Sequence, residues 1–552
     1  MRSLTRRQAL GALAAVPTGM LAYEAPDIPD AVVRRHDEAI EHLLVSQVIK
    51  AGSRGYGTLE DPRGVYAVRP AASFIEACMA AYLHPQSKFH ANPLLVDRMK
   101  LAAGYMERNQ HADGFIDYRD TNFDSPPDTG FTIHNLATAA CLAKRANRPD
   151  LLAITEPYMR KAGAGLVVGG IHTPNHRWVV CSALAQINEV FPDPSYIRRI
   201  DQWLQEGVDI DEDGQFTERS TSVYNAICDR AFLVIAAKLG RPALFEPVRK
   251  NLDSMLYLLH SDYDVVTEIS RRQDRDQRSA TMAAFWFPLQ YLAVKDGNGQ
   301  FATLANHLAP QSASLSAYME YPEMARRLPA PAGLPDHFER EMRALGIVRV
   351  RRGPISATLI SSDPIFFALH NGDVAIEGIR FASAFFGKGQ FSAPAIKKQG
   401  ENYVLSQKLE AAYYQPLNPP RRVTPATWST LRKERAATQT CVLEQIATVV
   451  QTPKGFRLRI QASGTEGVPV SIEINLRDGG KLEGVSSAAE GSALLPGGFA
   501  TYAGRENRIR FGPGLCEHSY TQVRGALPKL PGTSVYLTAF TPCDHTVEFE
   551  CE

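Results

Sequence analysis

A change of hydrophobic period along the chain is the strongest constraint on its fold. From about residue 30 to about residue 335, apolar residues recur at helical spacing in segments separated by turns with Gly, Pro or Asp. After a stretch rich in Pro and Gly at 328–337, the chain changes to short β-branched and aromatic runs. A chain with this order of periods should build a helical domain first and a sheet domain second.

The helical part reads as a succession of amphipathic helices of ordinary length. Two connections resemble each other, at 111–117 and 211–218, and each places an Asp-Gly turn after a helix. Repeated helical hairpins pack into arrays, so residues 28–335 are predicted to form an (α/α) toroid. The predicted helices cover 72–84, 96–109, 131–146, 176–191, 197–207, 225–240, 245–260 and 281–294.

The second part carries many short runs with turn signals between them. Strict alternation of apolar and polar residues, as at 456–461 and 545–550, predicts antiparallel strands with one solvent-exposed face. The number of runs favours an antiparallel β-sandwich over 336–552. A length of 552 residues also exceeds what one hydrophobic core normally serves, so the fold class is multidomain, α then β.

The first 22 residues resemble a twin-arginine export signal. Arg6 and Arg7 precede a short apolar stretch that ends in small residues near Ala22. An ordinary amphipathic first helix is the alternative. No later stretch is long enough for a transmembrane helix, so we expect a periplasmic or secreted protein without a membrane partner.

The charge balance limits the partners. Lys and Arg total 60 against 59 for Asp and Glu, which gives no overall field to hold nucleic acid or an anionic membrane. An anionic ligand must therefore meet a local basic cleft. The oligomeric state stays open.

The cysteines and the acidic residues give no sign of a metal site or a cofactor. The eight cysteines have no CxxC spacing, and the first four lie in apolar helical patterns, which favours core packing. Cys543 and Cys551 are left open as a disulfide pair. No group of His, Asp and Glu has the spacing of metal ligands, so we expect no metal and no cofactor.

The first candidate site lies at 169–180, where a Thr-Pro-Asn turn precedes a helix that begins near His176. A helix N-terminus offers free amide donors and a positive potential, which suits a carboxylate and an enolate. Asn175 alone fits an N-cap equally well. His176, Arg177 and Trp178 add an imidazole, a guanidinium and a stacking face, so Arg177 and Trp178 are predicted to bind substrate.

The second candidate is Tyr224, which follows a polar stretch and begins an apolar helix. The field at a helix N-terminus favours a phenolate. Packing at a helix end is the alternative. Arg219 and Glu218 lie nearby, and either orient the substrate or pair with each other.

Two further candidates are an arginine-rich segment at 265–278 and a histidine of the sheet domain. Such a segment is usually a solvated loop, but Arg271 and Arg272 are suited to clamp a carboxylate if the loop borders the cleft. His370 ends an apolar strand just before a turn, and we predict it as a third catalytic group. His134 and Asn135, in an apolar helical pattern, are predicted to pack inside the helical domain.

With these motifs, the chain resembles the heparinase II/III-like polysaccharide lyases and their alginate and oligoalginate lyase relatives. The resemblance rests on Asn175 and His176, on the DGxxxExxxxxY pattern that ends at Tyr224, and on the order of the domains. It implies that Asn175 and His176 flank a substrate carboxylate, that Tyr224 protonates the leaving oxygen, and that His370 is a second histidine. Relatives often carry His after the Tyr, where this chain has Asn225.

The implied reaction is β-elimination on an acidic polysaccharide or oligosaccharide that contains uronic acid. Its products carry an unsaturated uronate end. The base stays open among His176, His370 and Tyr224, and the polymer stays open among alginate, glucuronan, heparosan-like chains and a rhamnose-glucuronate exopolysaccharide.

Two alternatives remain from the residues. A glycoside hydrolase on the same toroid needs two carboxylates beside the scissile bond. The acidic candidates for this role are Asp113, Asp117, Asp124, Asp128, Asp211 and Asp213. A secreted glycan-binding protein without catalysis would also explain the aromatic residues and the arginines.

Overall fold

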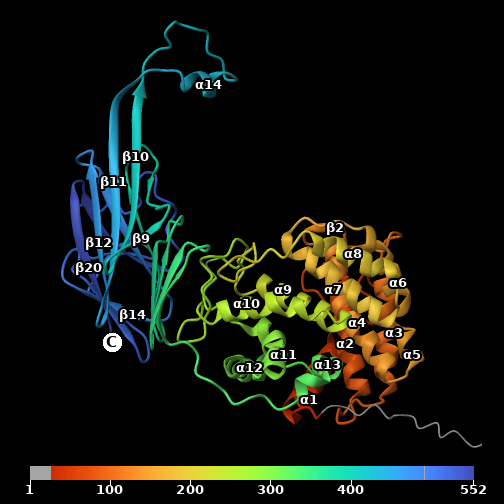
Figure 1. Cartoon of the computed structure of the whole chain (residues 1–552). Helices are drawn as coiled ribbons and strands as arrows, with labels where there is room; N and C mark the ends of the chain where they lie inside the picture. The colour runs from red at the N-terminus through yellow and green to blue at the C-terminus, as the bar shows by residue number, and fades with distance from the viewer. Residues whose placement is uncertain (1–26, 276, 490) are drawn as a thin grey trace, which may run out of the picture.

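The computed structural model describes residues 27–275, 277–489 and 491–552. The predicted export signal at 1–22 lies outside these residues. A helical domain is followed by a β domain, and the two lie side by side (Figure 1). The last helical element of the first domain ends at Ala325 and the first strand of the second begins at His337, on either side of the Pro- and Gly-rich stretch.

The helical domain consists of two layers of helices. Its helices are α1 (Asp30–Ser46), α2 (Val68–Leu83), α3 (Pro93–Arg108), α4 (Pro126–Arg145), α5 (Pro149–Leu152), α6 (Glu156–Val168), α7 (Pro174–Val190), α8 (Pro194–Gln205), α9 (Tyr224–Leu239), α10 (Phe245–Met255), α11 (Trp286–Asp296), α12 (Gly299–Ser312) and α13 (Leu315–Glu320). A short hairpin of β1 (Ile116–Tyr118) and β2 (Asn122–Ser125) precedes α4.

The layers follow from how much of each helix is apolar. The inner helices α2, α4, α7 and α9 pack each against the next, and α13 contacts both α2 and α4. These inner helices are buried on nearly every side, as expected for helices that are apolar all round. The outer helix α8 buries only Tyr196 and Ile200. The predicted toroid of helical hairpins is thus confirmed.

The β domain is a sandwich of two sheets. Its strands are β3 (His337–Met342), β4 (Ile347–Arg352), β5 (Ile355–Ile360), β6 (Phe367–Asn371), β7 (Val374–Ser383), β8 (Gly389–Gln390), β9 (Ile396–Gln399), β10 (Asn402–Tyr414), β11 (Ala437–Thr452), β12 (Gly455–Gly464), β13 (Pro469–Leu476), β14 (Lys481–Glu483), β15 (Ser486–Ala489), β16 (Ser492–Leu494), β17 (Ala500–Ala503), β18 (Arg508–Gly512), β19 (Thr533–Phe540) and β20 (Cys543–Cys551).

The order in one sheet is β14-β17-β18-β20-β12-β11-β10-β9, and in the other β15-β16-β19-β13-β7-β6-β5-β4-β3, with β8 on β7. Apolar side chains of both sheets form one core between them. The strand pairs are antiparallel except β16 with β19, which is parallel. The predicted antiparallel sandwich is confirmed apart from this pair.

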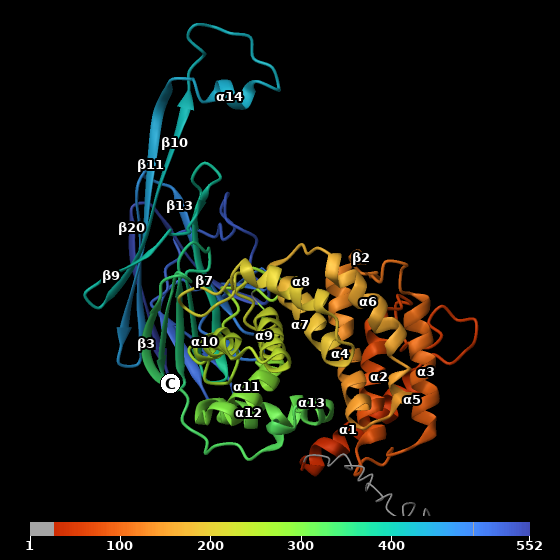
Figure 2. The same cartoon turned by 45° about the vertical axis from the view of Figure 1, so that its right-hand side comes forward.

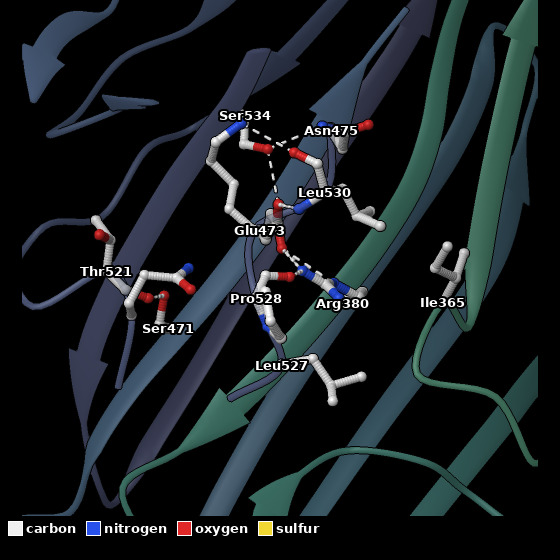
Figure 3. Close-up of polar contacts among 12 residues, drawn as sticks. Ile365, Arg380, Ser471, Glu473, Asn475, Thr521, Leu527, Pro528, Leu530 and Ser534 are labelled. Atoms are coloured by element: carbon white, nitrogen blue, oxygen red, sulfur yellow. Dashed lines mark hydrogen bonds and ion pairs between the residues drawn. The ribbon is translucent and has the colours of Figure 1, made fainter. Parts of the chain in front are cut away.

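A buried ion pair fixes the segment before β19 to the sheet. Arg380 on β7 pairs with Glu473 on β13, and Glu473 also accepts hydrogen bonds from the Leu530 amide at 2.9 Å and the Ser534 hydroxyl at 2.7 Å (Figure 3). Arg380 donates to the Pro528 carbonyl at 2.8 Å. This satisfies the charges where water is excluded and places Leu530 against the helical domain.

The cysteines of the helical domain are buried as predicted. The disulfide between Cys543 and Cys551, which the sequence left open, is excluded by the structure. Cys78, Cys141, Cys181 and Cys228 are buried free thiols, as expected for core packing. Cys543 and Cys551 are the two ends of the single strand β20. A strand rises about 3.3 Å per residue, so the two sulfurs are too far apart to bond.

Among the described residues, no helix is both long and apolar enough to cross a bilayer.

Candidate active site

A cleft of about 490 Å³ opens where four inner helices begin. The first turns of α2, α4, α7 and α9 all contribute to its wall, together with the β1–β2 hairpin and the loop at 272–273. Each helix N-terminus carries a partial positive charge and unpaired amide donors, so their convergence favours an anion in the cleft. The polar and aromatic lining includes Arg69, Tyr118, Asp128, Phe131, His172, His176, Tyr224, Arg272 and Gln273.

His176 lies in this wall, in the first turns of α7. Its side chain is 7% exposed, and its Nδ1 has no hydrogen-bond partner among the described residues. Burial, and then the ring of His172 at 4.8 Å, lower the pKa of His176 to about 4. The imidazole is therefore neutral at neutral pH and able to accept a proton.

Tyr224 is the first residue of α9, as the sequence predicts. The Arg272 guanidinium lies 4.9 Å from the centre of its ring, and the Gln273 amide donates a hydrogen bond of 2.5 Å to its hydroxyl oxygen. The Arg272 contact holds the ring in place, and because Gln273 donates to the oxygen, the hydroxyl keeps its own proton available for a further hydrogen bond.

Asn175 lies behind the wall that His176 forms. Its side chain is 1% exposed, and its amide donates to Glu218 at 2.5 Å. Glu218 in turn pairs with Arg272 at 3.2 Å. This chain of contacts connects Asn175 to the cation over Tyr224, whereas Asn175 itself is not among the residues that line the cleft. The actual N-cap of α7 is Thr173.

Arg177 and Trp178 are not part of the cleft, contrary to the prediction. Trp178 is fully buried in the core, and its indole donates to Asp209 at 2.9 Å. Arg177 pairs with Asp209 at 2.9 Å and with Glu206 at 3.2 Å. Successive residues of a helix point about 100° apart, so the two residues after His176 must face other directions.

Arg219 and Arg271 line a different space, a groove of about 530 Å³ between the two domains. Arg219 has a positive φ of 51° and donates to the Ala344 carbonyl at 2.5 Å. Arg271 donates to the Thr217 carbonyl at 3.3 Å. Of the three predicted arginines beyond Arg177, the structure thus brings only Arg272 to the cleft that holds Tyr224.

His370, which the sequence predicts as a third catalytic group, lies outside the cleft that holds Tyr224 and His176. It lines a cavity of about 180 Å³ between the helical domain and the sheet. Its ring stacks on His260 with 3.5 Å between centroids, and burial holds the pKa of both imidazoles well below the usual value. His370 is a contact between domains in this structure.

Arg69 is a residue of the cleft that the sequence did not single out. It lies in the first turn of α2, and its guanidinium is 5.1 Å from the Phe131 ring. It makes no ion pair with any described acidic side chain. Asp128 in the same cleft attracts it without pairing directly, so this exposed guanidinium beside helix N-termini is suited to hold a carboxylate. His172, four residues before His176, was visible in the sequence and also lines the cleft.

Of the six acidic residues of the hydrolase alternative, Asp113 accepts the Phe115 amide of its own turn and Asp124 pairs with His111. The other four divide into two groups. Asp117 and Asp128 line the cleft, and Asp128 accepts a hydrogen bond of 2.5 Å from Ser125. Asp211 and Asp213 serve turns and contacts between domains: Asp211 accepts the Gln215 amide at 2.9 Å, and Asp213 accepts the Ala344 amide at 2.7 Å.

Two triplets of described residues are close enough to share a cation. Their ligand atoms lie within 4.8 Å of one another: His111 with Asp117 and Asp124, and Cys141 with Glu189 and Glu320. Lys238 already pairs with both glutamates of the second triplet, and His111 pairs with both aspartates of the first. The absence of a metal stays a prediction.

His134 and Asn135 lie inside the helical domain, where they hydrogen bond to Ser182 and Glu76.

Comparison with known proteins places the fold. No protein-family model and no curated protein matches the sequence. The chondroitin AC lyase of Streptomyces coelicolor A3, solved with chondroitin sulphate, superposes with a TM-score of 0.56 at 12% identity, over 96% of this chain and 80% of that one. A Paenibacillus xanthan lyase gives 0.55 at 11% identity, over 94% of this chain and 57% of that one. A heparinase III gives 0.52 at 10% identity, over 96% and 86%.

These structures agree with the order of the domains and define the fold. The chain has the toroid and β-sandwich fold of these three lyase structures. At these identities the likeness concerns the fold, and the activity has to be argued from the cleft.

Proposed function

We propose that the protein is a polysaccharide lyase that cleaves a uronic-acid-containing glycan by β-elimination. One observation carries this proposal: Tyr224, with Arg272 and Gln273 at its ring and hydroxyl, shares with a neutral His176 one cleft that is lined by four helix N-termini. This arrangement combines an anion site with two groups that can move protons. The predicted export signal, if functional, would bring the enzyme to polymers outside the cytoplasm.

The carboxylate of the uronate has to be neutralised first. Abstraction of the C5 proton creates an enolate beside that carboxylate, and the extra charge is prohibitive unless it is stabilised. Arg69 and the amides at the starts of α2 and α7 are the groups that hold the carboxylate in this proposal. The developing charge then falls on preorganised donors in a partly dry cleft.

Two proton transfers complete the reaction. A base takes the C5 proton, the electron pair of that bond forms the C4=C5 double bond, and the C4–O4 bond breaks as O4 receives a proton from Tyr224. When the C5 proton and O4 lie on opposite faces of the sugar, His176 is the base. When they lie on the same face, Tyr224 takes the proton and returns it to O4.

The test is an assay of elimination with alginate, glucuronan, heparosan and a rhamnose-glucuronate polymer. Only elimination creates the conjugated C4=C5 double bond, so ultraviolet absorbance reports it directly. A rise in absorbance with one polymer would identify the reaction and the substrate. New reducing ends without the chromophore would instead indicate a hydrolase, for which Asp117 and Asp128 are the candidate acids.

Replacing Arg69 should weaken substrate binding. For Arg69→Ser we expect kcat/KM to fall roughly tenfold to a hundredfold, mainly through KM, because a charge-assisted hydrogen bond to the carboxylate is lost. Steady-state kinetics on the preferred polymer measures this. Arg177→Ser is the matched control, since its guanidinium pairs with Glu206 and Asp209 outside the cleft. Equal losses in both variants would argue against a carboxylate contact at Arg69.

A further inference from the structure

A long hairpin projects from the β domain. It consists of β10, β11 and the connection 415–436, which carries α14 (Trp428–Arg432), and is called the arm here. β9 pairs only with residues 402–405 of β10, and β12 pairs with β11 only from Leu443 onward. Beyond Ala411 and Cys441, no other described strand flanks the arm. Figures 1 and 2 show it extending past the rest of the sandwich.

Packing against its own domain does not account for this extension. A two-stranded hairpin alone is marginally stable in water, and β10 alone spans about 40 Å at the usual rise. The far part nevertheless keeps large aromatic side chains largely in solvent: Tyr414 is 45% and Trp428 49% exposed, and Tyr413 is 60% exposed although its ring lies 5.6 Å from that of Phe386. Exposed aromatic groups in such a place indicate a binding surface.

The connection at the end of the arm is strongly basic. It holds one acidic residue, Glu434, which pairs with Arg421. The chain as a whole is nearly neutral, so this local excess of positive charge is a particular property of the arm. The cationic residues of 415–436 are Arg421, Arg422, Arg432, Lys433 and Arg435.

Cations and rings alternate along this surface. The Arg432 guanidinium lies 5.6 Å from the Tyr414 ring, and that of Arg435 lies 5.2 Å from the Trp428 ring. Guanidinium groups bind carboxylates in a planar, bidentate way, and aromatic faces pack against the apolar faces of sugar rings. A polymer of acidic sugars offers both features in repetition.

The arm is also connected to the active-site region. At its base, β9 pairs with β10 and brings Lys398 to the groove between the domains, which Arg219 and Arg271 also line. The residue after Arg271 belongs to the cleft. In both views the end of the arm with α14 bends toward the side on which the helical domain lies (Figures 1 and 2).

We propose that the arm is a second binding site for the acidic polysaccharide, separate from the cleft, which holds a long chain while the cleft acts on another part of it. The identity of the ligand rests on the proposed function; the existence of an anionic-glycan site rests on the charge and the rings of the arm. A second copy of the chain is the other occupant to test. An arm-to-arm contact about a twofold axis would oppose like charges, whereas a polyanion is attracted along the whole surface.

The experiment compares two fourfold variants of the full-length protein, both in a Tyr224→Phe background that limits cleavage. The arm variant carries Arg421→Ser, Arg422→Ser, Arg432→Ser and Lys433→Ser. The control variant removes the same charge at exposed positions elsewhere: Lys50→Ser, Lys100→Ser, Arg198→Ser and Lys454→Ser. Affinity electrophoresis in gels with alginate, glucuronan or heparosan measures binding, with dextran as the neutral polymer.

We expect the arm variant to lose affinity for one of the acidic polymers by roughly tenfold, as several exposed ionic contacts together would give. Its affinity for a tetrasaccharide of the same polymer should not change, because so short a ligand fills only the cleft. The control variant should stay within about twofold of the parent, and added salt should weaken binding by the parent more than by the arm variant.

Several results would overturn the proposal. These are unchanged polymer affinity in the arm variant, an equal loss in the control variant, or no binding of any of the three polymers. A change of sedimentation coefficient in the arm variant with unchanged polymer affinity would assign the arm to a subunit contact. Trp428→Ala gives a second, less disruptive variant, and thermal unfolding checks that each variant is folded.

The two proposals fail in different ways. If no polymer yields the unsaturated product but binding still depends on the arm, elimination is excluded and the arm remains a glycan site. If a polymer is cleaved with the expected chromophore but the arm variant binds it like the parent, the lyase stands and the arm proposal is wrong.

Discussion

Tyr224→Phe should reduce the rate of elimination by about 10²- to 10⁴-fold, the usual contribution of one positioned acid or base. The substitution removes a single oxygen, which receives a hydrogen bond from Gln273 in the free protein. The ring, its cation contact with Arg272 and the start of α9 stay in place. Substrate binding should therefore change little, and the loss should be in kcat, measured by absorbance of the C4=C5 product.

The matched control for this variant lies in the same cleft. Tyr118 on β1 also lines it, whereas Arg272 and Gln273 contact Tyr224, and we expect Tyr118→Phe to keep activity within a few-fold. Nearly equal activities of the two variants would remove Tyr224 from the mechanism. Full activity of Tyr224→Phe together with loss in Asp117→Asn or Asp128→Asn would favour the hydrolase alternative instead.

Much of the fold could be predicted because its determinants are local. The spacing of apolar residues predicted the inner helices. The polar stretch before Tyr224 predicted the start of α9 correctly. The change of period at 328–337 separated the two domains in the same way. The meeting of His176 and Tyr224 in one cleft follows from these boundaries, because both residues begin neighbouring inner helices of a toroid.

Predictions of site residues were wrong where the direction of a side chain, rather than its position along the chain, decides whether it reaches the cleft. Trp178 is two residues from His176, but the helix turns it into the core, where a sequence pattern at a loop-to-helix junction gives no warning. His370 does lie in the predicted strand, yet which face of a sheet meets the other domain depends on how the domains dock. Its partner His260 is 110 residues away and belongs to the helical domain.

Arg69 could not be found from the sequence for a related reason. An arginine in the first turn of a helix is usually solvated, and nothing near it in sequence is unusual. It becomes significant only because four helices begin around one cleft and because no described carboxylate pairs with it. For Asn175 the sequence predicted the position at the start of α7, but it could not show that the side chain is buried against Glu218.

Acidification should weaken the contact between the domains through His260 and His370. Burial is the largest cause that holds the pKa of both stacked rings well below 6.5, and the charges of Arg349 and Arg477 act in the same direction. Below pH 6.5 the unfolded chain takes up protons that the folded chain excludes. The free energy of unfolding therefore decreases as the pH is lowered. Each such group contributes about 1.4 kcal/mol per pH unit, or about 3 kcal/mol for the pair.

The measurement has to isolate this effect, because Asp264 in the same cavity acts in the opposite direction. Burial and the neighbouring Asp262 raise the pKa of Asp264 to about 6, so the folded chain gains a proton there as the pH falls. Thermal unfolding from pH 7 to pH 5 should therefore compare the parent with His260→Phe/His370→Phe, which keeps two flat rings but cannot titrate. We expect the double variant to lose less stability between pH 7 and pH 5 than the parent does. The control His42→Gln, whose ring is exposed, should lose as much stability as the parent. Equal pH dependence in all three proteins would mean that the stacked pair accepts protons without cost.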